Sequence, residues 1–143
     1  MQTNYRIELM SIIKKKSQEN LDSARILIKN KKYNSSVHCS YYACFQMSKY
    51  CLNDNDCETY EEQDFYTKSS GNDSHNHISQ KTENFLKRNN RFHYLDYKEC
   101  MSSLKRMRKN ADYDQYDISE SEADLSYVNA NTVLKILNKY NRA

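Results

Sequence analysis

The chain has no proline and a single glycine, Gly71, among its 143 residues. Proline removes a backbone N–H donor and breaks helices, and glycine costs about 1 kcal/mol in a helix interior. Almost nothing in this sequence therefore interrupts a helix, and the prediction is an all-α fold. The length fits a single domain, residues 1–143, that is large enough to bury a core.

Apolar side chains recur at spacings of three and four residues in several segments, which is the pattern of helices that bury one face. Ser74 is a candidate cap for one of them, and Ser119-x-x-Glu122 is a capping box for the last. The second helix has the widest apolar face, so we expect it at the centre of an antiparallel bundle of four or five helices. The predicted helices cover residues 5–30 (continuous or broken near the lysines at 14–16), 34–52, 74–89, 96–111 and 119–140.

The segment 53–73 interrupts this pattern, because it is acidic, polar and without periodicity. We predict a loop here, with at most a short helical turn around residues 60–65. Its acidic residues and its lack of periodicity also predict that it is the most mobile internal part of the chain.

Composition narrows the class of protein further. Five cysteines, an odd number without a C-x-x-C pair, favour reduced thiols over a disulfide framework. A net charge of +3 permits contact with nucleic acid without requiring it. The sequence shows neither a signal-peptide pattern nor a run near the roughly 20 apolar residues of a membrane span, so we expect a cytoplasmic protein that does not enter membranes. No cofactor is expected.

The end of the fourth predicted helix contains the first candidate site, made of Arg108, Asp112 and Tyr113. Residues four apart share a helix face, so the Asp112 carboxylate can meet the Arg108 guanidinium, with the Tyr113 phenol one step round. An arginine fork binds phosphate through two parallel hydrogen bonds, and a phenol donates or accepts one. The alternative is an ordinary surface ion pair.

Two further groups of residues have both a functional and a structural interpretation. Tyr41 and Tyr42 could stack on bases, but in a central helix tyrosines more often pack in the core with a hydrogen-bonded hydroxyl. His75 and His77, with Asp73 nearby, suggest a metal site. Residues two apart on a helix point in different directions and no third ligand is evident, so no metal is expected.

The order and spacing of these motifs resemble the HEPN superfamily, specifically its small single-domain bacterial and archaeal members. The final helix agrees with the family by position only. Three segments carry the resemblance: residues 27–45, which end in Tyr41-Tyr42-Ala43-Cys44-Phe45; residues 75–85, with His75-x-x-Ile78 and Phe85; and residues 104–113, with Leu104-x3-Arg108-x2-Ala111-Asp112-Tyr113.

The resemblance implies a helical bundle that dimerises. Many members are metal-independent endoribonucleases with an R-x4-6-H motif at the dimer cleft, and small members are often toxins encoded beside a minimal nucleotidyltransferase antitoxin. In this chain Arg108 takes the place of the motif arginine, but five residues later stands Tyr113 rather than histidine. Asp112 or Tyr113 would have to replace it, and a tyrosine with a pKa near 10 is a poor base at neutral pH.

Two functions follow from the resemblance. One is an endoribonuclease of a toxin–antitoxin or defence system, in which Arg108 binds the scissile phosphate while Asp112 and Tyr113 orient the arginine and the attacking 2′-hydroxyl. The other is a non-catalytic module that binds nucleotide, RNA or a partner protein. In either case the candidate binding residues are Tyr41, Tyr42 and His75, and the expected assembly is a homodimer.

Overall fold

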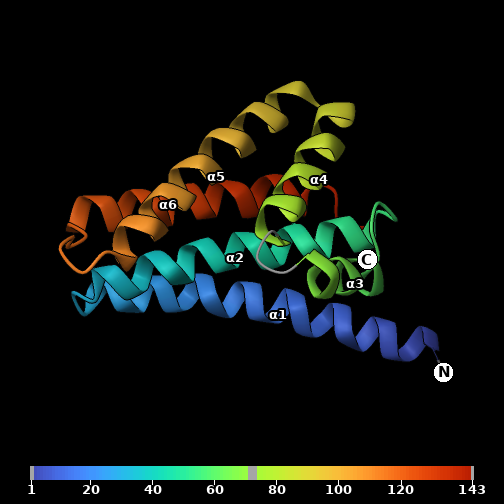
Figure 1. The fold of residues 1–143 in the computed structure, drawn as a ribbon, viewed down its shortest axis with the longest axis horizontal. Coiled ribbons are helices and arrows are strands. Elements are labelled where there is room, and N and C mark those ends of the chain that lie inside the picture. The colour runs from blue at the N-terminus through green and yellow to red at the C-terminus, as the bar shows by residue number, and fades with distance from the viewer. Residues whose placement is uncertain (1, 71–73, 143) are drawn as a thin grey trace.

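The computed structural model describes residues 2–70 and 74–142, and within these ranges it contains six α-helices and no strand (Figure 1). The all-α prediction is confirmed. The helices are α1 (Gln2–Lys29), α2 (Tyr33–Asp54), α3 (Tyr60–Ser70), α4 (Ser74–Asn89), α5 (Arg91–Asp112) and α6 (Glu120–Asn138).

Helix α2 is the centre of the bundle, as its wide apolar face predicted, because it packs against each of the other five helices. α1, α2 and α6 lie alongside one another, and α5 and α4 form an inclined pair that rises from this layer (Figure 1). α1 passes through the lysine run at 14–16 without a break. It turns into α2 over three residues, where Lys31 takes a left-handed φ of 59°.

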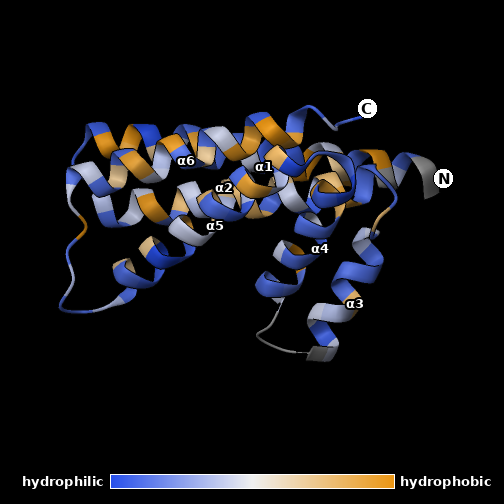
Figure 2. Cartoon of the chain, turned by 90° about the horizontal axis from the view of Figure 1, so that it is seen from above, coloured by the Kyte–Doolittle hydropathy of each residue, from blue (hydrophilic) through white to orange (hydrophobic). Residues whose placement is uncertain are grey.

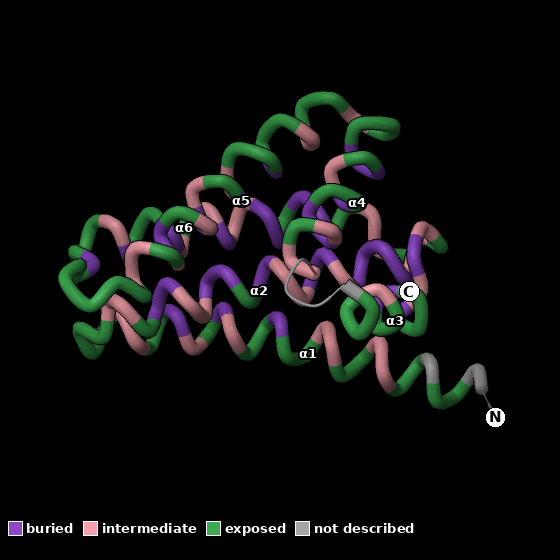
Figure 3. Tube along the Cα trace, viewed as in Figure 1, coloured by how far each residue is buried: buried purple, intermediate pink, exposed green. Residues whose placement is uncertain are grey.

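The core follows the same arrangement. Hydrophobic residues gather on α1, α2 and α6, whereas α3 and α4 are mostly hydrophilic (Figure 2), and the buried positions concentrate along α2 (Figure 3). Inside the core, the hydroxyl groups of Ser48 and Tyr97 share a hydrogen bond of 2.8 Å, so the fully buried Tyr97 phenol does not lack a partner. The largest fully buried apolar side chains include Tyr41, Tyr97, Met47, Leu52, Leu86 and Leu104.

The loop prediction for residues 53–73 is wrong over most of its length, because α3 occupies Tyr60–Ser70. Its start is a capping signal that the acidic composition obscured: the backbone N–H of Glu62 donates to Oγ1 of Thr59 at 3.2 Å. Glu61 and Glu62 then lie in the first turn, where the helix dipole favours negative charge. The bundle therefore has one helix more than expected. Residues 71–73, including Asp73 of the hypothetical metal site, lie outside the described residues.

At other helix ends, a capping side chain determines where the helix begins more strongly than the apolar periodicity does. α5 begins five residues before the predicted position 96, because the Asn90 side chain accepts hydrogen bonds from the backbone N–H groups of Phe92 and His93. The capping box of Ser119 and Glu122 is present as predicted. In the part of the chain that the structure describes, no helix combines the length and apolarity needed to cross a bilayer.

Candidate functional site

Arg108 lies on α5 and faces α2, where its Cζ is 4.3 Å from the centre of the Tyr41 ring. A guanidinium over an aromatic face is held by cation–π attraction. The Nε of Arg108 is buried and has no hydrogen-bond partner among the described residues. A buried donor without an acceptor costs about 1–3 kcal/mol, and a phosphate oxygen is the kind of acceptor that it lacks.

Asp112 does not form the i,i+4 ion pair with Arg108 that the sequence suggested. Its Oδ1 lies 3.1 Å from Nε2 of His38 on α2 instead. The two helices run in opposite directions (Figure 1). His38, one turn before Tyr41 on α2, therefore meets Asp112, one turn after Arg108 on α5. The pairing leaves the guanidinium without an ion-pair partner among the described residues.

His75, in the first turn of α4, contacts the same tyrosine that supports Arg108. Its Nδ1 is 2.9 Å from the Tyr41 hydroxyl, and its ring stacks on Phe45 with centroids 4.1 Å apart. Burial lowers the pKa of His75, and the charges of Arg108, Lys105 and Lys49 lower it further. The imidazole is therefore neutral at neutral pH, and its surroundings are electropositive.

Tyr41 and Tyr42 take the two roles that the sequence left open. Tyr41 is fully buried, and burial raises its pKa to about 12 although Arg108 acts in the opposite direction. It therefore keeps its proton and serves as a hydrogen-bonded core residue that supports Arg108 and His75. Tyr42 is 37% exposed and meets the His75 ring edge-on at 5.9 Å, so it is the accessible aromatic of the pair.

We call Tyr41, Tyr42, Phe45, His75 and Arg108 the Arg108 cluster. Two lysines extend it. The Lys49 ammonium lies 5.7 Å from the centre of the Phe45 ring, and the Lys105 ammonium donates to Oδ1 of Asn76 at 2.9 Å. The result is a set of stacked aromatic rings edged by three cations, drawn from three helices.

Tyr113 stands apart from the cluster. It follows the last residue of α5 with an extended backbone and is 64% exposed, and within the part of the chain that the structure describes no hydrogen bond, ion pair or ring contact joins it to Arg108. Its surroundings are a shallow surface pocket of about 390 Å³. That pocket is lined by Ser102, Lys105, Arg106, Lys109, Asn110 and Tyr113.

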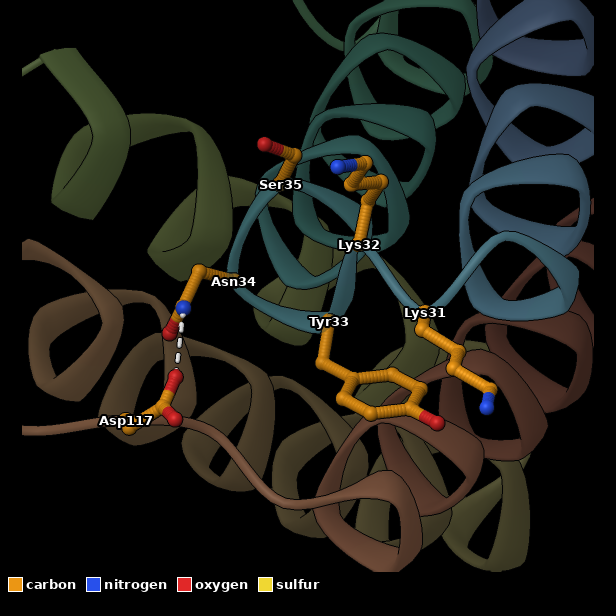
Figure 4. A pocket seen from close by; sticks show the side chains of 6 residues that line it. All are labelled: Lys31, Lys32, Tyr33, Asn34, Ser35 and Asp117. Carbon is orange, nitrogen blue, oxygen red and sulfur yellow. Dashed lines mark hydrogen bonds between the residues drawn. The ribbon is translucent and has the colours of Figure 1, made fainter.

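A second pocket, of about 310 Å³, lies at the turn between α1 and α2 and is lined by none of the predicted site residues (Figure 4). The Asn34 amide nitrogen donates to Oδ1 of Asp117 at 2.9 Å, and its oxygen accepts from the Ile118 backbone N–H at 3.0 Å. Asn34 thus connects the start of α2 to the segment before α6, and its two hydrogen bonds have a structural role.

The two histidines of the hypothetical metal site have separate partners. His77 pairs with Glu58, with 2.7 Å between Nε2 and Oε2, whereas His75 faces Tyr41. Over residues 2–70 and 74–142, no group of three or more His, Cys, Asp or Glu side chains is placed to hold a metal ion.

Sequence reasoning missed His38 and Phe45 as members of this region. Both stand at helical spacing from Tyr41 and Tyr42 on α2, so the pattern 38, 41, 42 and 45 could have revealed a shared face. What the pattern could not reveal is which residues of α5 this face meets.

Comparison with known proteins gives one family match. The model of the HEPN domain matches residues 10–140. Neither the curated proteins nor the solved structures contain a significant match.

Proposed function

The chain belongs to the HEPN family, and from this premise we propose that it is an RNA-directed protein of a toxin–antitoxin or defence system that binds single-stranded RNA at the Arg108 cluster and cleaves it as an endoribonuclease. The observation that carries the proposal is the position of Arg108. Its guanidinium lies over the Tyr41 ring, its Nε lacks an acceptor among the described residues, and its helix neighbour Asp112 pairs with His38 instead.

Charge supports RNA as the ligand. Burial lowers the pKa of His75, and the positive charges of Arg108, Lys105 and Lys49 lower it further, so the imidazole stays neutral. The local field therefore attracts anions, and the RNA backbone is a chain of them. A guanidinium can contact two oxygens of one phosphate at once.

The aromatic side chains favour a single-stranded ligand. Tyr42 is exposed, and Phe45 and His75 form a stack that is partly open to solvent. Unpaired bases stack on such rings, with about 1–3 kcal/mol gained per base. Bases in a duplex are already stacked on one another, so they are not free to stack on these side chains.

We further propose that the protein works as a homodimer and that a minimal nucleotidyltransferase is its antitoxin. Both proposals are supported by family membership. A two-fold axis beside α5 would bring two Arg108 clusters to one cleft. Light scattering should give a mass near twice 17.1 kDa, and expression without the antitoxin should arrest growth.

The test of the Arg108 cluster compares Arg108→Ala with Arg106→Ala, because both remove one positive charge from the same helix and Arg106 is exposed. Charge-assisted hydrogen bonds contribute about 1.5–3 kcal/mol, so Arg108→Ala should weaken binding of a labelled single-stranded oligoribonucleotide by about 10- to 100-fold. Arg106→Ala should change binding by only about twofold.

Binding is measured by fluorescence anisotropy at one fixed salt concentration, and the thermal stability of each variant is measured in parallel. Arg108→Lys should recover part of the affinity, because it keeps the charge and loses the fork. Equal losses in Arg106→Ala and Arg108→Ala would reduce binding to diffuse charge and refute the site. Absence of binding by the unmodified protein would refute the function.

A further inference from the structure

The pair of His38 and Asp112 lies one helical turn from the pair of Tyr41 and Arg108, along the same contact between α2 and α5. An α-helix rises 1.5 Å per residue, so Asp112 is displaced from Arg108 by about 6 Å along the axis of α5. His38 is displaced from Tyr41 by about 4.5 Å on α2. An imidazole therefore lies roughly one nucleotide linkage away from a guanidinium that is suited to hold a phosphate.

The contact with Asp112 favours one tautomer of His38. Carboxylate oxygens carry only lone pairs, so a ring nitrogen 3.1 Å from Oδ1 is best occupied by a proton. When Nε2 carries the proton, Nδ1 of the neutral ring keeps its lone pair. A carboxylate that orients a histidine in this way prepares the opposite nitrogen to accept a proton.

His75 differs in this respect. The Tyr41 phenol keeps its proton and lies next to Nδ1 of His75, so its hydroxyl can donate a hydrogen bond to the lone pair of that nitrogen. Nε2–H of His75 is then a donor suited to a phosphate oxygen. Of the two imidazoles beside Arg108, His38 is the one whose neighbour is an obligate acceptor.

We infer that His38, oriented by Asp112, is the general base that removes the proton from the attacking 2′-hydroxyl of RNA bound at the Arg108 cluster. This inference rests on the proposed function. The 2′-oxygen forms a bond to phosphorus while the bond from phosphorus to the 5′-oxygen breaks, which leaves a 2′,3′-cyclic phosphate. The proton passes from the 2′-hydroxyl to Nδ1 of His38, the 5′-oxygen takes a proton from water, and the imidazolium later releases its proton to solvent.

The exposure of the pair fits this role. The His38 side chain is 35% exposed and that of Asp112 is 64% exposed, so both can be reached from solvent. A pair whose only task was to join two helices would work equally well with any residue that donates to Asp112. Glutamine is such a residue, since its amide N–H can replace the imidazole N–H, but it has no basic lone pair.

His38→Gln is therefore the decisive variant. General-base catalysis contributes about 10²–10⁴-fold, so the single-turnover cleavage rate of a labelled oligoribonucleotide should fall by about that factor. Affinity for the 2′-deoxy form of the same oligonucleotide, which cannot be cleaved, should change by only about twofold. His93→Gln is the matched control, because His93 makes its hydrogen bond with Tyr140, away from the cluster.

Two further variants separate catalysis from packing. Asp112→Asn should lower the rate and spare the affinity, because an amide no longer dictates the tautomer of His38. Added imidazole should restore part of the rate of His38→Ala and should not affect Arg108→Ala, in which the phosphate contact itself is missing.

Each outcome has one meaning. A slow His38→Gln protein with intact binding and rescue of His38→Ala supports the inference. Unchanged cleavage by His38→Gln overturns it while the endoribonuclease function stands. An unmodified protein that binds the oligoribonucleotide and never cleaves it overturns both the inference and the catalytic part of the proposed function.

Discussion

Among the residues that the structure describes, a histidine pairs with a carboxylate in two places, and the surroundings of the two pairs differ. His38 and Asp112 meet at the open surface between α2 and α5. His77 and Glu58 meet at 2.7 Å where α4 meets the start of α3, with side chains only 16% and 7% exposed, and the Tyr66 ring covers His77 at a centroid distance of 3.7 Å.

The same two functional groups therefore have different uses. At the closed pair, neither group can reach a ligand, and the contact joins α4 to the segment that leads into α3. α3 packs only lightly on α2 and α4, and this pair adds a contact between α4 and the segment that leads into the short helix. At the open pair, solvent screens the attraction, so it adds little stability and the imidazole remains available for chemistry.

The largest expected difference between the pairs is in stability. His77→Ala leaves the Glu58 carboxylate buried, and Oε1 of this carboxylate already has no hydrogen-bond partner among the described residues. Loss of one member of a buried pair costs roughly 3–5 kcal/mol. Urea unfolding followed by circular dichroism should show this loss for His77→Ala, whereas His38→Ala should lose no more than about 1 kcal/mol. Similar small losses in both variants would abolish the distinction.

The sequence predicted which residues share a face of one helix better than it predicted the contacts between helices. The face of α2 and the Arg108-to-Tyr113 spacing were visible because both are local patterns on one helix. The pairing of His38 with Asp112 was not, because it depends on how α2 crosses α5. The closed pair was missed for a second reason: Glu58 and Thr59 stand in an acidic stretch that composition alone assigned to a loop, and the capping contact of Thr59 outweighed it.

A smaller effect should appear in the pH dependence of stability and would sharpen the contrast between the two histidines of the Arg108 region. The pKa of His75 is lowered in the folded protein by burial and by Arg108. Below the ordinary histidine pKa of about 6.5 the unfolded chain therefore binds more protons, so this group destabilises the fold as pH falls and has no effect above that value. His75→Gln should remove this part of the decline between about pH 7 and pH 5, as measured by denaturant titration. An unchanged slope would contradict the neutral state assigned to His75.

The smallest effect concerns Asp112. Since the pair with His38 is exposed, Asp112→Ala should change the free energy of unfolding by about 0.2–1 kcal/mol. Calorimetry measures this difference. A loss comparable to that of His77→Ala would mean that Asp112 belongs to the packing between α2 and α5, and the open pair would then be structural as well.

The central position of α2 has a consequence for how the protein opens. Every other helix rests on α2, so no large part of the bundle can detach without exposing the buried face of this helix. Local opening with a low free energy is then confined to peripheral elements such as α3, whose contacts are few. Tyr41, whose ring supports the Arg108 guanidinium, lies on α2 itself, and its amide should exchange with solvent only through global unfolding. The aromatic face on which the Arg108 guanidinium lies is thus maintained for as long as the domain is folded, without a separate local equilibrium of its own.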